Sequence, residues 1–245
     1  MSVNLKVIAI SGSLRLKSHN TALLESAKVL SPENMEIEIF SLKDIPLYNE
    51  DVEKEGVPES VKIFKDKIAN SDSMLIASPE YNYSFTGVLK NAIDWASRPP
   101  SDSPLKRKPY ALMGVSGGIS GTIRSQMHFR QVAFHNDMAA MNRPEVYVTN
   151  GRSKFNENNE LTDEPTILHL RKFLSNCEGV IVTVYEGLLS TKIFPFLSYI
   201  SPRGGVSVIV LTEFLLDSFV SSSVENSWRY ASLTTNAINT IRQKA

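Results

Sequence analysis

Blocks of apolar and polar residues alternate along the chain in a way that predicts strands and helices in turn. The segments "LKVIAI" (5–10), "SMLIASP" (73–79), "KPYALMGV" (108–115) and "EVYVT" (145–149) are short and mostly apolar. Such runs are typical of strands buried on both faces of a parallel sheet. In "MEIEIF" (35–40) apolar and acidic residues alternate, which predicts a strand near the sheet edge. The pattern therefore predicts five strands.

Segments with a helical repeat of apolar residues separate these strands. They begin near Ser18 to Asn20 and at Pro58, Val88, Gly121 and Asp163. Parallel strands joined by helices require right-handed crossovers, so we expect an α/β, doubly wound sandwich. A five-stranded parallel sheet with the flavodoxin-like strand order is the predicted fold class.

The C-terminal part of the chain has a different texture. After the last predicted helix the residues are apolar and serine-rich, with few charges. We therefore predict a domain over 1–176 and an atypical extension of unknown role over 177–245. Charged residues such as Glu186, Lys192 and Arg203 interrupt its apolar blocks. A bilayer span needs about 20 consecutive apolar residues, so a membrane-spanning segment is not expected.

Composition narrows the class of partner. The 245 residues carry 26 basic and 26 acidic side chains, so the overall charge favours neither nucleic acid nor an anionic membrane, and a small molecule is expected. The single cysteine, Cys177, excludes an intramolecular disulfide and fits a reducing compartment. The first residues lack the pattern of a secretory signal, which predicts a cytoplasmic protein.

The loop after the first predicted strand, "SGSLRLKSHN" (11–20), is strongly polar. Ser11, Ser13 and Ser18 offer hydroxyl groups, Gly12 permits close approach, and Arg15 can bind an anion through two hydrogen bonds. The helix start adds backbone N–H groups and a favourable dipole for a phosphate monoester. The loop matches neither the dinucleotide motif nor the P-loop. By itself, it is equally compatible with a serine-capped helix start.

Two further polar loops follow neighbouring strands. They are "SPEYNYSFTG" (78–87), which carries tyrosines and an asparagine, and "GVSGGISG" (114–121), which is rich in glycine. In a doubly wound sheet all three loops lie at the carboxyl edge, where ligands bind. A phosphate loop flanked by an aromatic loop and a glycine-rich loop favours flavin mononucleotide, FMN.

These motifs identify a family resemblance. "GSLRLKSHNTALL", "DIPLYNED", "SPEYNYSFTGVLKNAIDWASRP" and "GVSGGISGTIRSQMHFRQV" resemble the NAD(P)H-dependent FMN reductases of flavodoxin-like fold, over residues 3–176. The resemblance implies a homodimer or homotetramer. It has no counterpart for residues 177–245. It assigns FMN binding to the residues Ser11, Gly12, Ser13, Arg15, Ser18, Asn20, Pro79, Glu80, Tyr81, Asn82, Ser116, Gly117 and Gly118.

By the same resemblance, NADPH or NADH gives a hydride to bound FMN. The flavin then reduces a small-molecule electron acceptor such as a quinone, flavin, chromate or azo compound. The chemistry takes place on the flavin, so no catalytic side chain is expected. For the 2'-phosphate of NADPH, basic residues of "RPPSDSPLKRK" (98–108) are candidates, among them Arg98, Lys106 and Arg107. No metal site is expected, because the two histidines of the same predicted helix, His128 and His135, are two turns apart.

Two other functions remain open at this point. The first is a flavodoxin-like electron carrier that binds FMN but does not oxidise NAD(P)H. Its usual strong acidity is absent here, which counts against it. The second is a noncatalytic interaction protein in which the C-terminal extension has compromised the site.

Overall fold

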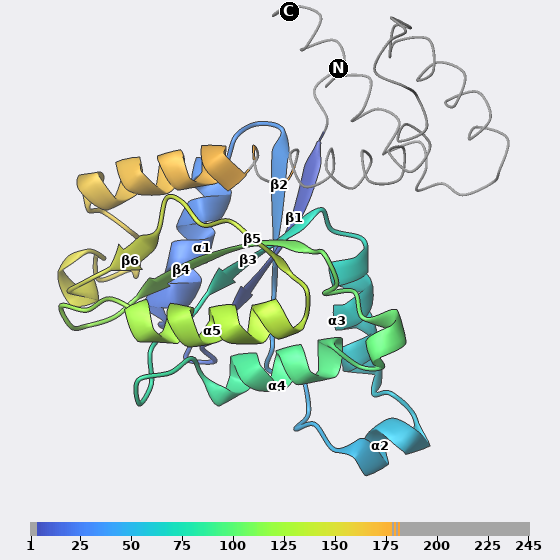
Figure 1. The fold of residues 1–245 in the computed structure, drawn as a ribbon. Helices are drawn as coiled ribbons and strands as arrows, with labels where there is room; N and C mark the ends of the chain where they lie inside the picture. The colour runs from blue at the N-terminus through green and yellow to red at the C-terminus, as the bar shows by residue number, and fades with distance from the viewer. Residues whose placement is uncertain (1–3, 178, 180, 182–245) are drawn as a thin grey trace, which may run out of the picture. The chain divides into compact units, whose positions relative to one another are not determined.

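The computed structural model describes residues 4–177, 179 and 181, and these residues form a parallel sheet with helices on both faces (Figure 1). Strand β1 (Leu5–Ser11) lies between β2 (Met35–Phe40) and β3 (Ser73–Ala77), and β4 (Pro109–Val115) follows β3. Every strand pair is parallel. The predicted flavodoxin-like α/β sandwich is confirmed.

The fifth strand position is shared by two short strands. β5 (Ala139–Ala140) pairs with the start of β4, and β6 (Val146–Val148) pairs with its end. The predicted strand "EVYVT" corresponds to β6. β5 has only two residues, too few for an apolar repeat, so the sequence pattern did not indicate it.

Two helical layers cover the sheet (Figure 1). Helices α3 (Glu59–Ala69), α4 (Gly87–Ala96) and α5 (Ile123–His135) bury Phe64, Ile93 and Phe129 on one face in a shared core. α1 (His19–Leu30) and a helix over 164–177 cover the other face, where Leu23 and Phe173 are fully buried. This arrangement leaves the carboxyl ends of β1, β3 and β4 at one edge, followed by the three polar loops.

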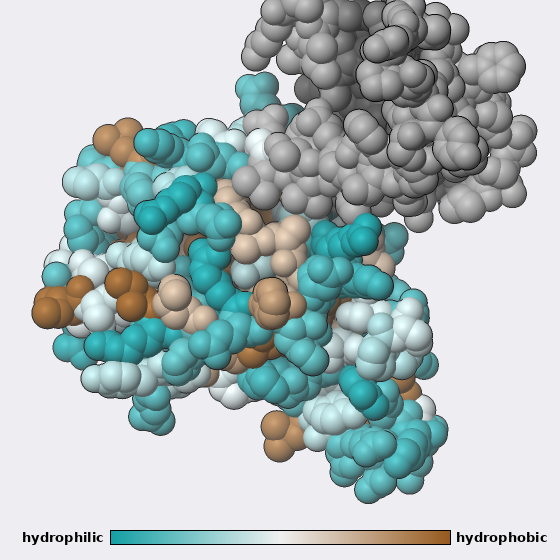
Figure 2. All heavy atoms as spheres, viewed as in Figure 1, coloured by the Kyte–Doolittle hydropathy of each residue, from teal (hydrophilic) through white to brown (hydrophobic). Residues whose placement is uncertain are grey.

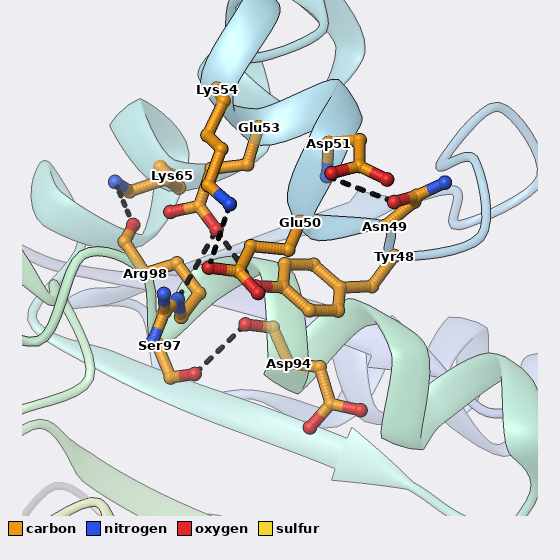
Figure 3. A network of polar contacts seen from close by, with 10 residues as sticks. All are labelled: Tyr48, Asn49, Glu50, Asp51, Glu53, Lys54, Lys65, Asp94, Ser97 and Arg98. Atoms are coloured by element: carbon orange, nitrogen blue, oxygen red, sulfur yellow. Dashed lines mark hydrogen bonds and ion pairs between the residues drawn. The ribbon is translucent and has the colours of Figure 1, made fainter.

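A short helix, α2 (Glu50–Glu55), was not predicted from the sequence. Figure 3 shows the polar network that holds it on the rest of the domain. Glu53 Oε2 accepts hydrogen bonds from the Tyr48 hydroxyl at 2.8 Å and from Arg98 Nε at 3.2 Å. Lys65 Nζ donates to the Arg98 carbonyl at 2.6 Å. α2 buries none of its residues, so these contacts, rather than an apolar stripe, position it.

The surface around α4 and α5 is mostly hydrophilic. Figure 2 shows the hydrophobic residues of this face as small groups among hydrophilic ones. Within the described part of the chain, no helix is both long and apolar enough to cross a membrane.

The end of the last described helix is buried against the sheet. Cys177 and Ile181 line a small apolar cavity together with Leu174 and Met35. Cys177 lies one residue beyond the predicted end of the domain. The remainder of the predicted extension, from residue 182 on, is outside the described residues.

We expect Cys177 to be chemically inert in the folded protein. Burial raises the pKa of its thiol from 9.0 to about 12, so iodoacetamide at pH 8 should label the native chain far more slowly than the urea-unfolded chain. Because the folded state holds this proton more tightly, the free energy of unfolding should fall as the pH rises above 9.0. Mass spectrometry gives a direct readout with a single cysteine, and equal labelling rates would refute the prediction.

Candidate active site

The first loop joins β1 to α1 and is organised by its own serines. Ser11 Oγ accepts hydrogen bonds from the Ser13 N–H at 3.2 Å and from the Thr21 hydroxyl at 3.0 Å. Ser18 is the N-cap of α1, and its hydroxyl accepts from the Thr21 N–H at 3.4 Å. Ser18 is buried whereas Arg15 is exposed, so the arginine lies on the solvent side of a locally ordered loop.

Gly12 joins the first loop to the second. Its N–H donates to the Ala77 carbonyl at 2.9 Å, and its own carbonyl accepts from the Thr86 hydroxyl at 2.7 Å. A Cβ atom on Gly12 would lie 2.9 Å from Thr86 Oγ1 and 3.1 Å from Pro79 Cδ. The two loops are therefore packed too closely here for any side chain.

We expect Gly12→Ala to destabilise the fold by about 1–3 kcal/mol, because the added methyl group overpacks a contact whose Thr86 hydroxyl is already hydrogen-bonded. Urea unfolding would measure this loss. The matched control is Gly117→Ala, since a Cβ there meets no described atom within 4 Å and should change stability by less than about 0.5 kcal/mol. Similar losses in both variants would contradict the argument.

Asn20 joins the first loop to the third. Its Nδ2 donates to the Val115 carbonyl at 3.0 Å, and its Oδ1 accepts from the Val115 N–H at 2.9 Å. Both groups of the buried amide are thus used at the end of β4. The pairing of Ala77 with Met113 would put Pro79 opposite Val115, but proline has no N–H to continue the ladder. The Asn20 amide takes the place of the missing strand neighbour.

The second loop contains a two-residue hairpin. Tyr81 and Ser84 exchange backbone hydrogen bonds of 2.9 and 3.0 Å, and Asn82 and Tyr83 between them have φ of 50° and 69°. Two consecutive residues with positive φ are the signature of a type I′ turn. Both tyrosine side chains are exposed. The hairpin therefore presents its aromatic residues at the carboxyl edge of the sheet.

Glu80, beside the hairpin, faces the start of α5. Its carboxylate accepts from the Arg124 N–H at 2.9 Å, from Arg124 Nη1 at 2.8 Å and from the Ser125 N–H at 3.3 Å. Burial by itself raises the pKa of Glu80, but the hydrogen bonds from Arg124 and Ser125 outweigh it and hold the pKa below its usual value. The carboxylate is therefore ionised, and its hydrogen bonds go to groups of the protein itself.

The third loop presents backbone with open space beside it. Ser116 donates its N–H to the Val148 carbonyl at 3.0 Å, and its carbonyl accepts from the Gly151 N–H at 2.8 Å. A Cβ placed on Gly117 or Gly118 would meet no described atom within 4 Å. Glycine is not required there by the packing of the described chain. The space is available to a ligand lying against the backbone.

Three elements of the site were not found from the sequence. Thr86 and Ser125 hydrogen-bond the second loop to its neighbours, and Ser125 Oγ donates to the Pro79 carbonyl at 2.9 Å. The His19 ring stacks on Phe155, with centroids 4.6 Å apart. Burial, and after it the charges of Arg15 and Arg152, lower the pKa of His19, which favours the neutral imidazole. For Thr86 there was one signal in the sequence, a threonine two residues before the predicted helical repeat.

Two of the three candidate contacts to a 2'-phosphate are paired within the chain. Arg98 Nε lies 3.2 Å from Glu53 Oε2, and Arg107 Nε lies 3.8 Å from Asp137 Oδ2. Among the described residues, no cluster of three or more histidine, cysteine, aspartate or glutamate side chains could hold a metal ion. A charged groove of about 360 Å³ lies away from the three loops, between β2 and α3.

The arrangement suits an elongated ligand with an anionic end and a flat ring. Hydroxyl groups, the Arg15 guanidinium and the N-terminus of α1 favour a phosphate monoester at the first loop. A Cβ on Gly117 or Gly118 would meet no described atom within 4 Å, so a flat ring can approach the backbone there. The nearby carboxylate of Glu80 is neutralised by Arg124. The residues present therefore fit FMN.

Comparison with known proteins agrees with this geometry. Residues 5–153 match the family described as NADPH-dependent FMN reductase. An NAD(P)H-dependent FMN reductase of Pseudomonas aeruginosa is 48% identical over 164 residues, which cover 67% of this chain and 88% of the relative. A 2-hydroxy-1,4-benzoquinone reductase of a Burkholderia species is 39% identical over 170 residues, 69% of this chain and 92% of the relative.

A solved structure shares both fold and sequence. It is FerB, a flavoenzyme NAD(P)H:(acceptor) oxidoreductase of Paracoccus denitrificans, with a TM-score of 0.67 and 34% identity over 72% of this chain and 97% of that one. The chain belongs to the NADPH-dependent FMN reductase family and is an FMN-dependent oxidoreductase that uses NAD(P)H.

Proposed function

We propose that this chain transfers electrons from NADPH or NADH to a quinone, through FMN bound across its three carboxyl-edge loops. The proposed location of FMN rests on the contacts that hold these three loops together. Gly12 contacts the second loop, and Asn20 bonds to the strand that leads into the third. The name of the Burkholderia relative, a 2-hydroxy-1,4-benzoquinone reductase, supports the acceptor class.

At the phosphate end, Ser13 and Arg15 donate hydrogen bonds to the monoester. The first backbone N–H groups of α1 have no partner within the helix, so they also donate to the phosphate. Ser11, Ser18 and Asn20 have a different role in this proposal. Their side chains are buried in contacts within the chain, so they shape the loop that presents the donors.

At the ring end, Tyr81 and Asn82 of the hairpin lie on one side and Gly117 and Gly118 on the other. Pro79 and Ser116 set the starting points of these two loops. FMN supplies the chemistry, since its ring accepts a hydride from the nicotinamide and passes electrons on. The protein binds and orients the ring, and backbone N–H groups favour negative charge there.

The test is a spectrum followed by a titration. The purified protein, reconstituted with FMN, should show the absorbance of an oxidised flavin and bleach when NADPH or NADH is added without oxygen. Addition of 1,4-benzoquinone should then restore the absorbance of the oxidised flavin. Bleaching without reoxidation by quinones would overturn the acceptor class, and a flavin that NAD(P)H does not bleach would favour the electron carrier.

We also infer a homodimer or homotetramer in the cytoplasm. The solvent-facing side of α5 supports self-association, because Ile123, Met127 and Phe134 follow a helical repeat and are exposed. The single cysteine, which cannot form an intramolecular disulfide, supports a reducing compartment. Light scattering after size-exclusion chromatography should give a mass of two or four chains. A monomer would contradict this assembly.

A further inference from the structure

The hairpin of Tyr81 to Ser84 and the preceding Glu80 contact α5 at Arg124, Ser125 and His128. The side chain of Arg124 contacts both Glu80 and Tyr83. Its Nη1 and its backbone N–H both donate to the Glu80 carboxylate, at 2.8 and 2.9 Å. The Glu80 side chain is only 10% exposed, so solvent screens this ion pair less than a surface pair. The carboxylate also lies at the N-terminus of α5, where the helix dipole favours negative charge. Glu80 is thereby held at a defined place.

Arg124 also contacts the turn of the hairpin. Its guanidinium carbon lies 4.0 Å from the centroid of the Tyr83 ring. Tyr83 has a φ of 69°, in the left-handed region that is unfavourable for a bulky residue. The stacking contact offsets part of that cost. A hydrogen bond of 3.1 Å between His128 Nδ1 and Ser84 Oγ is a second contact of the hairpin with α5.

We propose that Arg124 is a positioning residue for the flavin ring. It acts through Glu80 and Tyr83, holding the hairpin in its binding conformation before the ring arrives. This inference rests on the proposed location of FMN at the three loops. A preformed site binds more tightly than one that must be ordered on binding. Because the hairpin lies at the ring end, its loss should weaken every ligand that carries the ring, with or without a phosphate.

The experiment compares FMN with riboflavin, which lacks the phosphate. The apoprotein of Arg124→Met should bind both ligands about five- to tenfold more weakly than wild type. The matched control is Arg130→Met, which removes another arginine of α5 whose bonds go to Asn142 and Met141. Its affinities should remain within about twofold of wild type. Far-UV circular dichroism checks that both variants are folded.

A second variant keeps the proposal testable if Arg124→Met does not fold. Tyr83→Leu keeps the Glu80–Arg124 ion pair and removes only the stacked ring, so we expect a loss of about threefold for both ligands. Hydrogen exchange gives a readout independent of flavin. The amides of Tyr81 and Ser84, which are hydrogen-bonded within the hairpin, should exchange faster in Arg124→Met than in Arg130→Met. The visible circular dichroism of the bound ring should change at saturation.

The outcomes separate this inference from the proposed function. Parallel losses for FMN and riboflavin, with faster exchange, support it. A loss confined to FMN would overturn it, because Arg124 would then act on the phosphate. Unchanged affinities in Arg124→Met would also overturn it, while a loss of FMN affinity in Arg15→Ala would leave the proposed location standing. If none of these variants changes flavin binding, the location itself is wrong.

Discussion

Arg15→Ala should weaken FMN binding by about 10- to 100-fold and leave riboflavin binding unchanged. Arg15 is exposed and lies three residues before the N-cap of α1, in the loop that carries Ser13. A charge-assisted hydrogen bond to a phosphate contributes about 1.5–3 kcal/mol, and each 1.4 kcal/mol is tenfold in affinity. Riboflavin lacks the phosphate and so does not use this contact. Fluorescence titration of the apoprotein with the two ligands measures the difference.

The control for Arg15→Ala is Lys17→Ala. Lys17 is another exposed cation two residues away in the same loop, so its loss reports the general effect of charge. We expect a change of less than about threefold at physiological salt, where the field of a solvated charge is screened. Equal effects of the two substitutions would mean that the loop attracts the anion only through its net charge. Undiminished FMN affinity in Arg15→Ala would contradict the assignment of the phosphate to this loop.

The meeting of the three polar loops at one edge could be predicted because it depends only on where the parallel strands end. Parallel strands bring their carboxyl ends to one edge, so polar loops after β1, β3 and β4 had to lie together. Ser18 was expected at the helix start and is its N-cap. These inferences need only local pattern and topology. They do not depend on the distance between two particular side chains.

The contacts between loops could not be predicted in the same way. Glu80 and Arg124 are 44 residues apart, and nothing in either motif indicates that they form an ion pair. α2 was missed because "EDVEKE" has no apolar stripe and is positioned by contacts to Tyr48 and Arg98. In each case a polar side chain had several possible partners, and tertiary packing decided among them.

The choice of hydrogen-bond partner is expected to affect stability most at Asn20. The family resemblance assigns it to FMN binding, whereas its amide is hydrogen-bonded to Val115 in both directions. Asn20→Leu should therefore destabilise the fold by about 3–5 kcal/mol, because it leaves a buried N–H and a buried carbonyl without partners. Urea unfolding monitored by circular dichroism measures the loss in the absence of any flavin.

The control for Asn20→Leu is Asn159→Gly, which removes a partly buried amide that donates to the Ser18 carbonyl at 3.3 Å and suits the φ of 66° at this position. One longer hydrogen bond near solvent should contribute no more than about 1 kcal/mol. A comparable loss in the two variants would show that the strand-like pairing of Asn20 with Val115 is not special. A stable Asn20→Leu that binds FMN poorly would instead make Asn20 a direct ligand of the phosphate. A strongly destabilised Asn20→Leu would mean that Asn20 connects the phosphate loop to β4. The flavin site and the stability of the fold would then depend on the same two hydrogen bonds.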